Sequence, residues 1–310
     1  MPLDLTLHAT RRPRFVDRGS REPSWRTLHR LADAAYPAFA LAWQVLFEDL
    51  QESLDFATVQ TALETRNLLV LDDVVRSAWT RLATEAQQQA LLPILTDLVG
   101  KAGAAMAPST SATLGVSVAF NVAAPEVLAV AEQYAGTQIL GIGETTLQAV
   151  RQSLRLSFAE GRGLAQLRAD LRSVIGVTPR QAATLERLRQ RLTTDGMSVA
   201  GVRARVAEAS ARAIRQRVEA IARMETIWAA NAGQNELWLQ AEKDGVLDPR
   251  RLERSFIVTP DDRTCPVCRP MQGQRRGLRE PFVSPYNGAT ALFPPMHVMC
   301  RCAVKLITVL

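Results

Sequence analysis

Several features that place a chain in a special structural class are scarce in this sequence of 310 residues. Its 16 Pro and 17 Gly are close to average usage, which excludes collagen-like and low-complexity chains. Long apolar runs are also lacking, since the most apolar window, residues 34–47, contains Gln44 and leads into Glu48 and Asp49. We therefore expect no segment long enough to span a membrane and no membrane contact. The first residues, MPLDLTLHATRRPRF, lack the elements of a secretory signal, so we expect a protein made and used in the cytoplasm.

Aromatic residues make up 5% of the chain and lysine occurs three times, yet 47% of the residues are hydrophobic, which is enough for a substantial core. The net charge of +6 is unevenly distributed: residues 1–30 carry +4, residues 31–150 carry −9 and residues 151–310 carry +11. This segregation predicts an acidic surface for a basic protein and a basic surface for nucleic acid or an acidic protein. Solvated helix faces are the alternative explanation.

Apolar residues recur at three- and four-residue steps over most of the chain, which predicts a mainly α-helical body. The small and polar residues 105–115 predict a linker and a domain boundary. The longest helical pattern covers residues 202–243, and Gly233 within it is interpreted as a kink.

The composition changes after Pro249, where two β-prone segments, residues 255–259 and 302–309, enclose a region rich in Pro and Gly. We therefore expect a small C-terminal α+β zinc-binding module on a helical body. The predicted organisation is a basic extended arm at 1–25, an N-terminal helical region at 26–107, a helical region ending in a long helix at 116–249, and the module at 250–310.

All four cysteines and one of the three histidines lie in this module. They follow the pattern C-x2-C, 28 intervening residues, then H-x2-C-x-C, formed by Cys265, Cys268, His297, Cys300 and Cys302. A CPVC turn presents two thiolates to one metal ion, and the HVMCRC segment supplies the other side of a tetrahedron. Because thiolates with one imidazole suit zinc, the pattern predicts a Zn²⁺ site.

Five candidate ligands compete for four positions. Cys300 and Cys302 both face the metal if they alternate along a strand, with His297 outside the ligand set. Alternatively, His297 is a ligand and one of the two late cysteines is not. Two disulfides, free thiols or a redox-active CPVC are the other interpretations, but a cytoplasmic chain keeps its thiols reduced and no βαβ pattern surrounds the CPVC sequence.

The predicted site is structural rather than catalytic. A zinc deaminase needs a His-x-Glu element upstream of its cysteines, and the chain has none. A metal-dependent nuclease needs a further histidine as base, and the module contains only His297. A closed ligand set supplies folding energy on the order of 10 kcal/mol. We therefore expect no catalytic residues and no enzymatic activity.

Seven arginines are candidates for contact with nucleic acid or a partner protein: Arg11, Arg12 and Arg14 in the arm, and Arg269, Arg275, Arg276 and Arg279 between the two halves of the ligand pattern. A solvated basic loop is the alternative, because few aromatic residues accompany these arginines for base stacking. His8 and His29 are isolated and receive no role.

Three stretches together resemble a known family. They are VEAIARMETIWAANAGQNELW (residues 218–238), TPDDRTCPVCRPMQG (residues 259–273) and FPPMHVMCRC (residues 293–302). In order and spacing they are similar to the head morphogenesis, or minor head (minor capsid), protein family of tailed bacteriophages, typified by the Mu-like phages. Met224 replaces the family's usual Thr, and Val298 stands where Pro is frequent. The resemblance covers roughly residues 200–310.

The resemblance implies a structural, low-copy component of the phage head without enzymatic activity. Such a protein is assembled with the portal protein and the major capsid protein in the host cytoplasm and retained in the virion head, where its basic segments meet packaged DNA. We also expect Arg223 and Glu225 to stabilise the junction between the long helix and the module. The alternative function is a zinc-containing DNA-binding protein without a virion role, and an enzyme such as a nuclease is a third.

Overall fold

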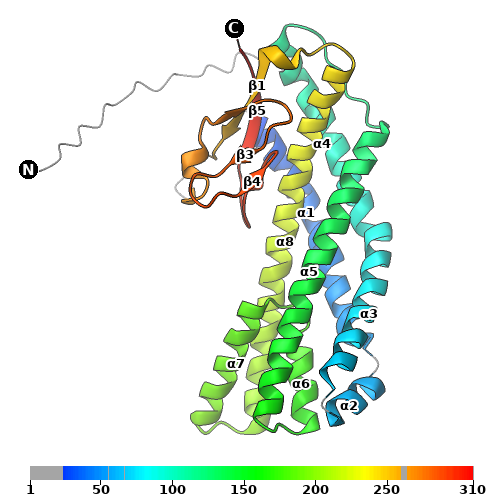
Figure 1. The fold of residues 1–310 in the computed structure, drawn as a ribbon, viewed down its shortest axis with the longest axis vertical. Coiled ribbons are helices and arrows are strands. Elements are labelled where there is room, and N and C mark those ends of the chain that lie inside the picture. The colour runs from blue at the N-terminus through cyan, green and yellow to red at the C-terminus, as the bar shows by residue number, and fades with distance from the viewer. Residues whose placement is uncertain (1–23, 55, 66, 260–263, 310) are drawn as a thin grey trace, which may run out of the picture.

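A computed structural model describes residues 24–54, 56–65, 67–259 and 264–309. Long helices lie side by side along the molecule, and a small region of strands packs against one end of them (Figure 1). The fold is thus mainly helical with a small C-terminal strand region, as the sequence predicts. The predicted arm, with Arg11, Arg12 and Arg14, lies almost entirely outside the described residues. The helices are α1 (Ser24–Glu52), α2 (Phe56–Glu64), α3 (Leu68–Ala86), α4 (Leu92–Leu114), α5 (Pro125–Ala159), α6 (Leu164–Val174), α7 (Pro179–Thr194) and α8 (Val199–Lys243).

Helices α3 and α4 form one continuous helical segment, joined by the π-helical turn η1 (Gln87–Leu91). The segment begins after Asn67, whose side chain accepts hydrogen bonds from the N–H groups of Leu69 and Val70. It ends at Gly115, which has a φ of +72° and supplies the left-handed C-terminal cap.

The prediction of a linker at residues 105–115 is wrong, because residues up to Leu114 are the last turns of α4. The hydroxyl groups of Ser109, Ser111 and Thr113 donate to carbonyls three or four residues earlier, so these small polar residues fit a helix. Helices from both sides of this stretch contribute to one hydrophobic core. The assignment of domains itself stays a prediction.

The segment Leu68–Leu114 also corrects the expectation that no stretch is long enough to span a membrane. Within the described ranges it is the one helix that is sufficiently long and apolar by length and composition. In its most apolar window 44% of the residues are buried inside the protein, and α4 packs against α1, α5 and α8. An apolar core helix meets the same criterion, so this finding is weak evidence for a membrane.

Helix α8 runs unbroken for 45 residues from Val199, and it is capped by Ser198, whose hydroxyl accepts the N–H of Gly201. Gly233 allows a close approach of helices rather than a break in this helix. A Cβ atom at position 233 would lie 2.1 Å from the carbonyl oxygen of Val99 and 2.9 Å from the Gly103 nitrogen. The backbones of α4 and α8 therefore meet at Gly233.

The strand region contains two small antiparallel sheets. The larger contains β2 (Arg275–Arg276), β1 (Leu252–Ile257) and β5 (Ala303–Thr308) in that order, and it pairs Phe256 with Val304. The smaller pairs β3 with β4. The strands and short 3-10 helices are η2 (Pro249–Arg251), β1 (Leu252–Ile257), η3 (Arg269–Met271), β2 (Arg275–Arg276), β3 (Phe282–Val283), β4 (Thr290–Ala291) and β5 (Ala303–Thr308).

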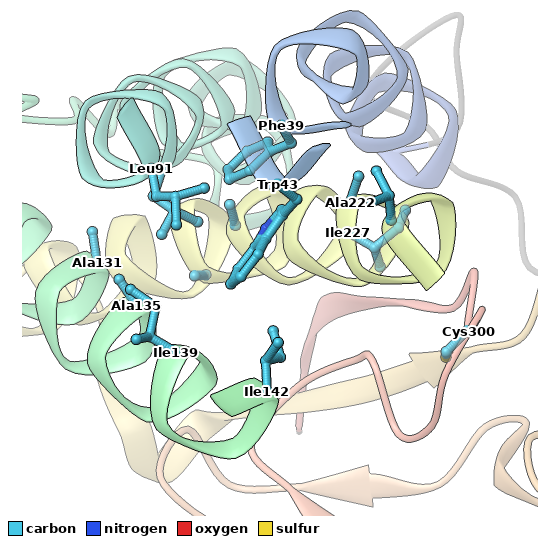
Figure 2. Close-up of a cluster of buried hydrophobic side chains, with 14 of the residues drawn as sticks. Phe39, Trp43, Leu91, Ala131, Ala135, Ile139, Ile142, Ala222, Ile227 and Cys300 are labelled. Atoms are coloured by element: carbon cyan, nitrogen blue, oxygen red, sulfur yellow. The ribbon is translucent and has the colours of Figure 1, made fainter. Parts of the chain in front are cut away.

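The hydrophobic core surrounds the C-terminal half of α8. Figure 2 shows Phe39 and Trp43 of α1 and Ile142 of α5 in the same buried cluster as Ile227 of α8. The cluster continues without interruption into the strand region, where it includes Cys300 (Figure 2). The helical body and the predicted module are therefore packed on a shared core.

Candidate metal centre

The two halves of the cysteine pattern meet between the tip of β1 and the start of β5. Cys265 and Cys268 lie in the turn that leads into η3, where the Cys265 sulfur accepts the N–H of Cys268 at 3.4 Å. His297 and Cys300 come from the loop after β4, and Cys302 directly precedes β5. Cys268, Cys300 and Cys302 are buried, while Cys265 and His297 are half-buried. The spacing in the sequence thus predicts correctly which side chains come together.

The donor atoms lie at distances that suit metal coordination. His297 Nε2 is 3.0 Å from the sulfurs of Cys265 and Cys268, and the sulfurs of Cys268 and Cys300 are 3.7 Å apart. In a tetrahedral zinc site with Zn–S bonds of about 2.3 Å, neighbouring sulfurs are about 3.8 Å apart. A disulfide requires about 2.05 Å between sulfurs, and all four cysteines are free. The geometry fits metal ligation and not a disulfide.

Cys268 is the donor that connects the cluster. One group of candidate ligands contains Cys265, Cys268 and His297, and a second contains Cys268, Cys300 and Cys302, with all donor atoms of a group within 4.8 Å of one another. All five residues named by the sequence pattern therefore belong to one cluster that can hold a metal ion. The choice of four among them stays a prediction.

The hydrogen bonding of His297 leaves the correct ring nitrogen available for a metal. Nδ1 lies 2.7 Å from the carbonyl oxygen of Val298, which can only accept a hydrogen bond. Nδ1 is therefore a donor, and Nε2, which faces Cys265 and Cys268, is the ring nitrogen that would ligate a metal ion on losing its proton. This orientation favours the ligand sets that include His297.

The thiols also interact strongly with one another. Hydrogen bonds from Cys268 and Cys302 lower the pKa of the Cys300 thiol far below its usual value. The hydrogen bond to Cys300 raises the pKa of Cys268, and a hydrogen bond to Cys300 also raises the pKa of His297 to about 9. Cys300 is thus the first thiol to become a thiolate, which is the form that ligates metals.

Three residues that the sequence analysis did not single out attach this cluster to the helices. Asn231 of α8 donates from Nδ2 to the carbonyl of Cys302 at 3.5 Å, and His29 of α1 donates from Nε2 to the carbonyl of Arg301 at 2.7 Å. Trp228 of α8 packs against Phe293, with ring centroids 5.9 Å apart. The only sequence signal for these contacts is the Asn-Ala-Gly stretch, because an isolated histidine gives none.

Arg254 was also missed, although it organises the loops of the strand region. Its side chain is fully buried in the centre of β1 and donates to the carbonyl oxygens of Gly277, Glu280 and Leu292. It also reaches Asn235 Oδ1 on α8, at 3.4 Å. Burial lowers the pKa of this guanidinium to about 10. An arginine inside a β-prone apolar segment is the signal that was available.

The proposed junction residues lie on two different faces of α8. Arg223 forms an ion pair with Glu219 and lies over the ring of Tyr36 of α1. Glu225 is buried, which raises its pKa to about 8. Its charge also contributes, after burial, to the raised pKa of Tyr134 on α5. The described contacts of both residues are with the helical body, and their contribution to stability stays a prediction.

The four arginines of the predicted basic loop each contact the protein itself. Arg275 lies 3.9 Å from a carboxylate oxygen of Glu253, and Arg279 forms an ion pair with Glu242 of α8. Arg276 donates to the carbonyl of Pro281, and Arg269 lies 3.5 Å from the carbonyl of Thr264. Arg269, Arg275 and Arg279 nevertheless stay exposed.

Comparison with known protein families identifies a match. The family model described as Phage Mu protein F like protein matches residues 148–305, about half of the chain. The match contains α8 and the whole cysteine and histidine cluster, and it starts about 70 residues before the first stretch that carries the resemblance. No curated protein and no solved structure matches the chain. With its three motifs and this match, the chain belongs to the phage Mu protein F like family, in agreement with the resemblance to Mu-like head morphogenesis proteins.

Proposed function

We propose that the protein is a structural, non-enzymatic minor head protein of a tailed phage, which takes part in head assembly at or near the portal. The observation that carries this proposal is the family match over residues 148–305. Its partners in the proposal are other head components, namely the portal protein and the major capsid protein. Assembly takes place in the host cytoplasm, and the protein stays in the virion head.

Counting the protein in particles tests this role. Quantitative mass spectrometry on purified virions and on DNA-free heads compares its copy number with that of the portal subunit. A few copies in both particles is the expected result. Absence from both would contradict the minor head role and leave a cytoplasmic assembly factor or a DNA-binding protein.

We further propose that Zn²⁺ binds the cysteine and histidine cluster and stabilises the strand region. The support is the donor set: three buried cysteines, a fourth half-buried one and a histidine whose Nε2 faces the sulfurs. A bound zinc ion would supply folding energy to a region whose two sheets contain only short strands. The residues of the chain position the donors: Asn231 and His29 hold the backbone around Cys302.

The zinc proposal predicts the largest loss of stability in the molecule. Cys268→Ser removes the donor shared by both ligand groups, so we expect loss of bound zinc and unfolding of the strand region. Elemental analysis measures the zinc, and hydrogen exchange of β1 and β5 measures the folding. Val298→Ser, at an exposed position in the loop that carries His297 and Cys300, is the control and should keep both. A protein that folds fully without zinc, or Cys268→Ser with normal zinc content, would refute the site.

Contact with packaged DNA is the remaining part of the proposal, supported by the +11 charge of residues 151–310. Duplex binding by the full chain should weaken steeply as the salt concentration rises. Arg275→Ala together with Arg276→Ala should reduce this binding if the loop contacts DNA. Unchanged binding in that variant would remove the loop from the interface.

A further inference from the structure

A groove between α7 and α8 is lined by arginines over an apolar floor. It lies at the end of the helical body opposite the strands (Figure 1) and has a cavity volume of about 680 Å³. Leu185, which is buried, forms the floor together with Leu188 and Ala213. The rim carries Arg180, Arg187, Arg191 and Arg212.

The arginines of α7 form one continuous stripe. Arg180, Thr184, Arg187 and Arg191 follow one another at steps of four, three and four residues, which places them on one face of the helix. All of them are exposed. Arg187 donates to the hydroxyl of Thr184, and none of the three arginines forms an ion pair with a residue in the described ranges. The α7 side of the rim is therefore a positively charged surface that no described acidic residue of the chain neutralises.

One face of α1 carries exposed apolar and acidic side chains, which complement the apolar floor and the basic rim of the groove. Leu41, Val45, Glu48 and Glu52 also follow one another at steps of four, three and four residues. Leu41 is 61% exposed and Val45 43% exposed, although the opposite face of α1 contains the buried Phe39 and Trp43. Both glutamates are exposed, and neither forms an ion pair with a described residue. Glu48 accepts a hydrogen bond from Gln44 of its own helix. Two large apolar side chains in water, followed by two carboxylates without an ion pair among the described residues, mark an unpartnered helix face.

We propose that the α1 stripe of one copy of the chain docks into the α7–α8 groove of a second copy. Leu41 and Val45 then cover the apolar floor, and Glu48 and Glu52 meet the arginines of the rim. With the two helices parallel and side by side, the equal spacing places Glu48 opposite Arg187 and Glu52 opposite Arg191. A nucleic acid would satisfy the arginines but would leave the leucines and alanines of the floor without an apolar partner.

The contact joins two different surfaces of the chain. It is isologous if two copies form it reciprocally, and heterologous if successive copies repeat it around a ring. In a single molecule the stripe stays exposed, because α1 packs against α8 through its other face. The inference is independent of the metal site and goes beyond the proposed head role.

Sedimentation velocity of the full chain over a concentration series tests the proposal. The unsubstituted protein should associate, and more weakly at high salt. Two double variants, Glu48→Arg with Glu52→Arg and Arg187→Glu with Arg191→Glu, place like charges opposite each other. Each alone should raise the dissociation constant about a hundredfold. A mixture of the two variants should associate again, because the reversed stripe then meets the reversed groove.

Matched controls separate this contact from a general charge effect. Arg81→Glu with Arg155→Glu reverses two exposed arginines on α3 and α5 and should leave association unchanged. Circular dichroism melts should show that all variants fold. A chain that stays monomeric at every concentration would overturn the proposal, as would mixed variants that do not associate. Binding of a duplex oligonucleotide by a monomeric chain, lost in Arg187→Glu with Arg191→Glu, would assign the groove to nucleic acid and overturn it as well.

Discussion

The two halves of α8 have the same helical backbone but differ in how much of their side chains is exposed. Between Val199 and Gln216 most side chains are exposed, and a narrow apolar stripe faces α6 and α7. Between Glu225 and Trp238 nearly all side chains are buried, because α1, α4 and the strand region surround the helix. An amphipathic pattern thus describes only the half at the surface. In the buried half, the positions of the polar residues indicate which segments pack against the helix.

Several polar groups in the buried half have a defined partner. Asn231 binds the carbonyl of Cys302, Asn235 accepts from Arg254, and the indole nitrogen of Trp238 donates to Thr110 of α4. These contacts fix how the strand region and α4 sit on the helix. The oxygen atoms Asn231 Oδ1 and Gln234 Oε1 are buried without a hydrogen-bond partner among the described residues. Polar residues here therefore specify the arrangement at a cost in stability.

Glu225 should give the largest effect within α8. Burial raises its pKa to about 8 from the usual 4.5, so the folded protein binds this proton more tightly than the unfolded chain does. The resulting stability is complete below pH 4.5 and is lost as the pH rises through 8. At pH 8 we expect Glu225→Gln to be more stable than the unsubstituted protein by on the order of 4 kcal/mol, with almost no difference near pH 4.5.

Denaturant unfolding at a series of pH values measures this difference. Both proteins keep Glu236, whose pKa burial raises to about 7, and the same cysteine cluster, so only position 225 differs between them. Glu132→Gln on the exposed face of α5 is the control and should change little at any pH. A Glu225→Gln protein with the unsubstituted stability at pH 8 would mean that the carboxylate has a partner in solution.

The same substitution, Gly→Ala, can be made at Gly233 in the buried half of α8 and at Gly201 in the exposed half, which compares how tightly the two halves are packed. Gly233→Ala places a methyl group against the backbone of α4 at Val99, and we expect a loss of about 3 kcal/mol. At Gly201 the nearest atom is the flexible side chain of Met197, so Gly201→Ala should be neutral or stabilise by up to about 1 kcal/mol. Thermal unfolding of both variants tests this. Equal losses would show that the two halves are equally packed.

The smallest effect is expected at the surface ion pair of the exposed half. Arg205 lies 3.4 Å from Glu208, and both side chains are more than half exposed. Arg205→Ala should reduce the free energy of unfolding by less than about 0.5 kcal/mol. Chemical denaturation at low and high salt measures it. A loss well above 1 kcal/mol would place Arg205 in a tighter network than the ion pair indicates.

The sequence predicted the features that depend on spacing along the chain. The C-x2-C and H-x2-C-x-C elements identified all five side chains of the cluster, because a turn and a short loop fix their local geometry. It failed where distant segments decide the outcome. Residues 105–115 were predicted to be a linker because they are small and polar, whereas in the structure hydroxyl groups among them donate to carbonyls of their own helix. Gly233 was predicted to be a kink because the sequence around it gives no sign of α4, the helix that contacts it. His29 gave no pattern, and the only signal for Arg254 was an arginine in a β-prone segment, since the partners of both are backbone carbonyls far along the chain.

The packing of β5 has a consequence for how the protein is made. This strand contacts both α1 and α4, and the residue just before Cys302 accepts a hydrogen bond from His29. During synthesis α1 leaves the ribosome long before β5 does, so the buried half of α8 waits with one side open until residues 303–308 arrive. A nascent chain therefore exposes apolar surface over most of its translation. Completion of β5 is the event that covers this surface.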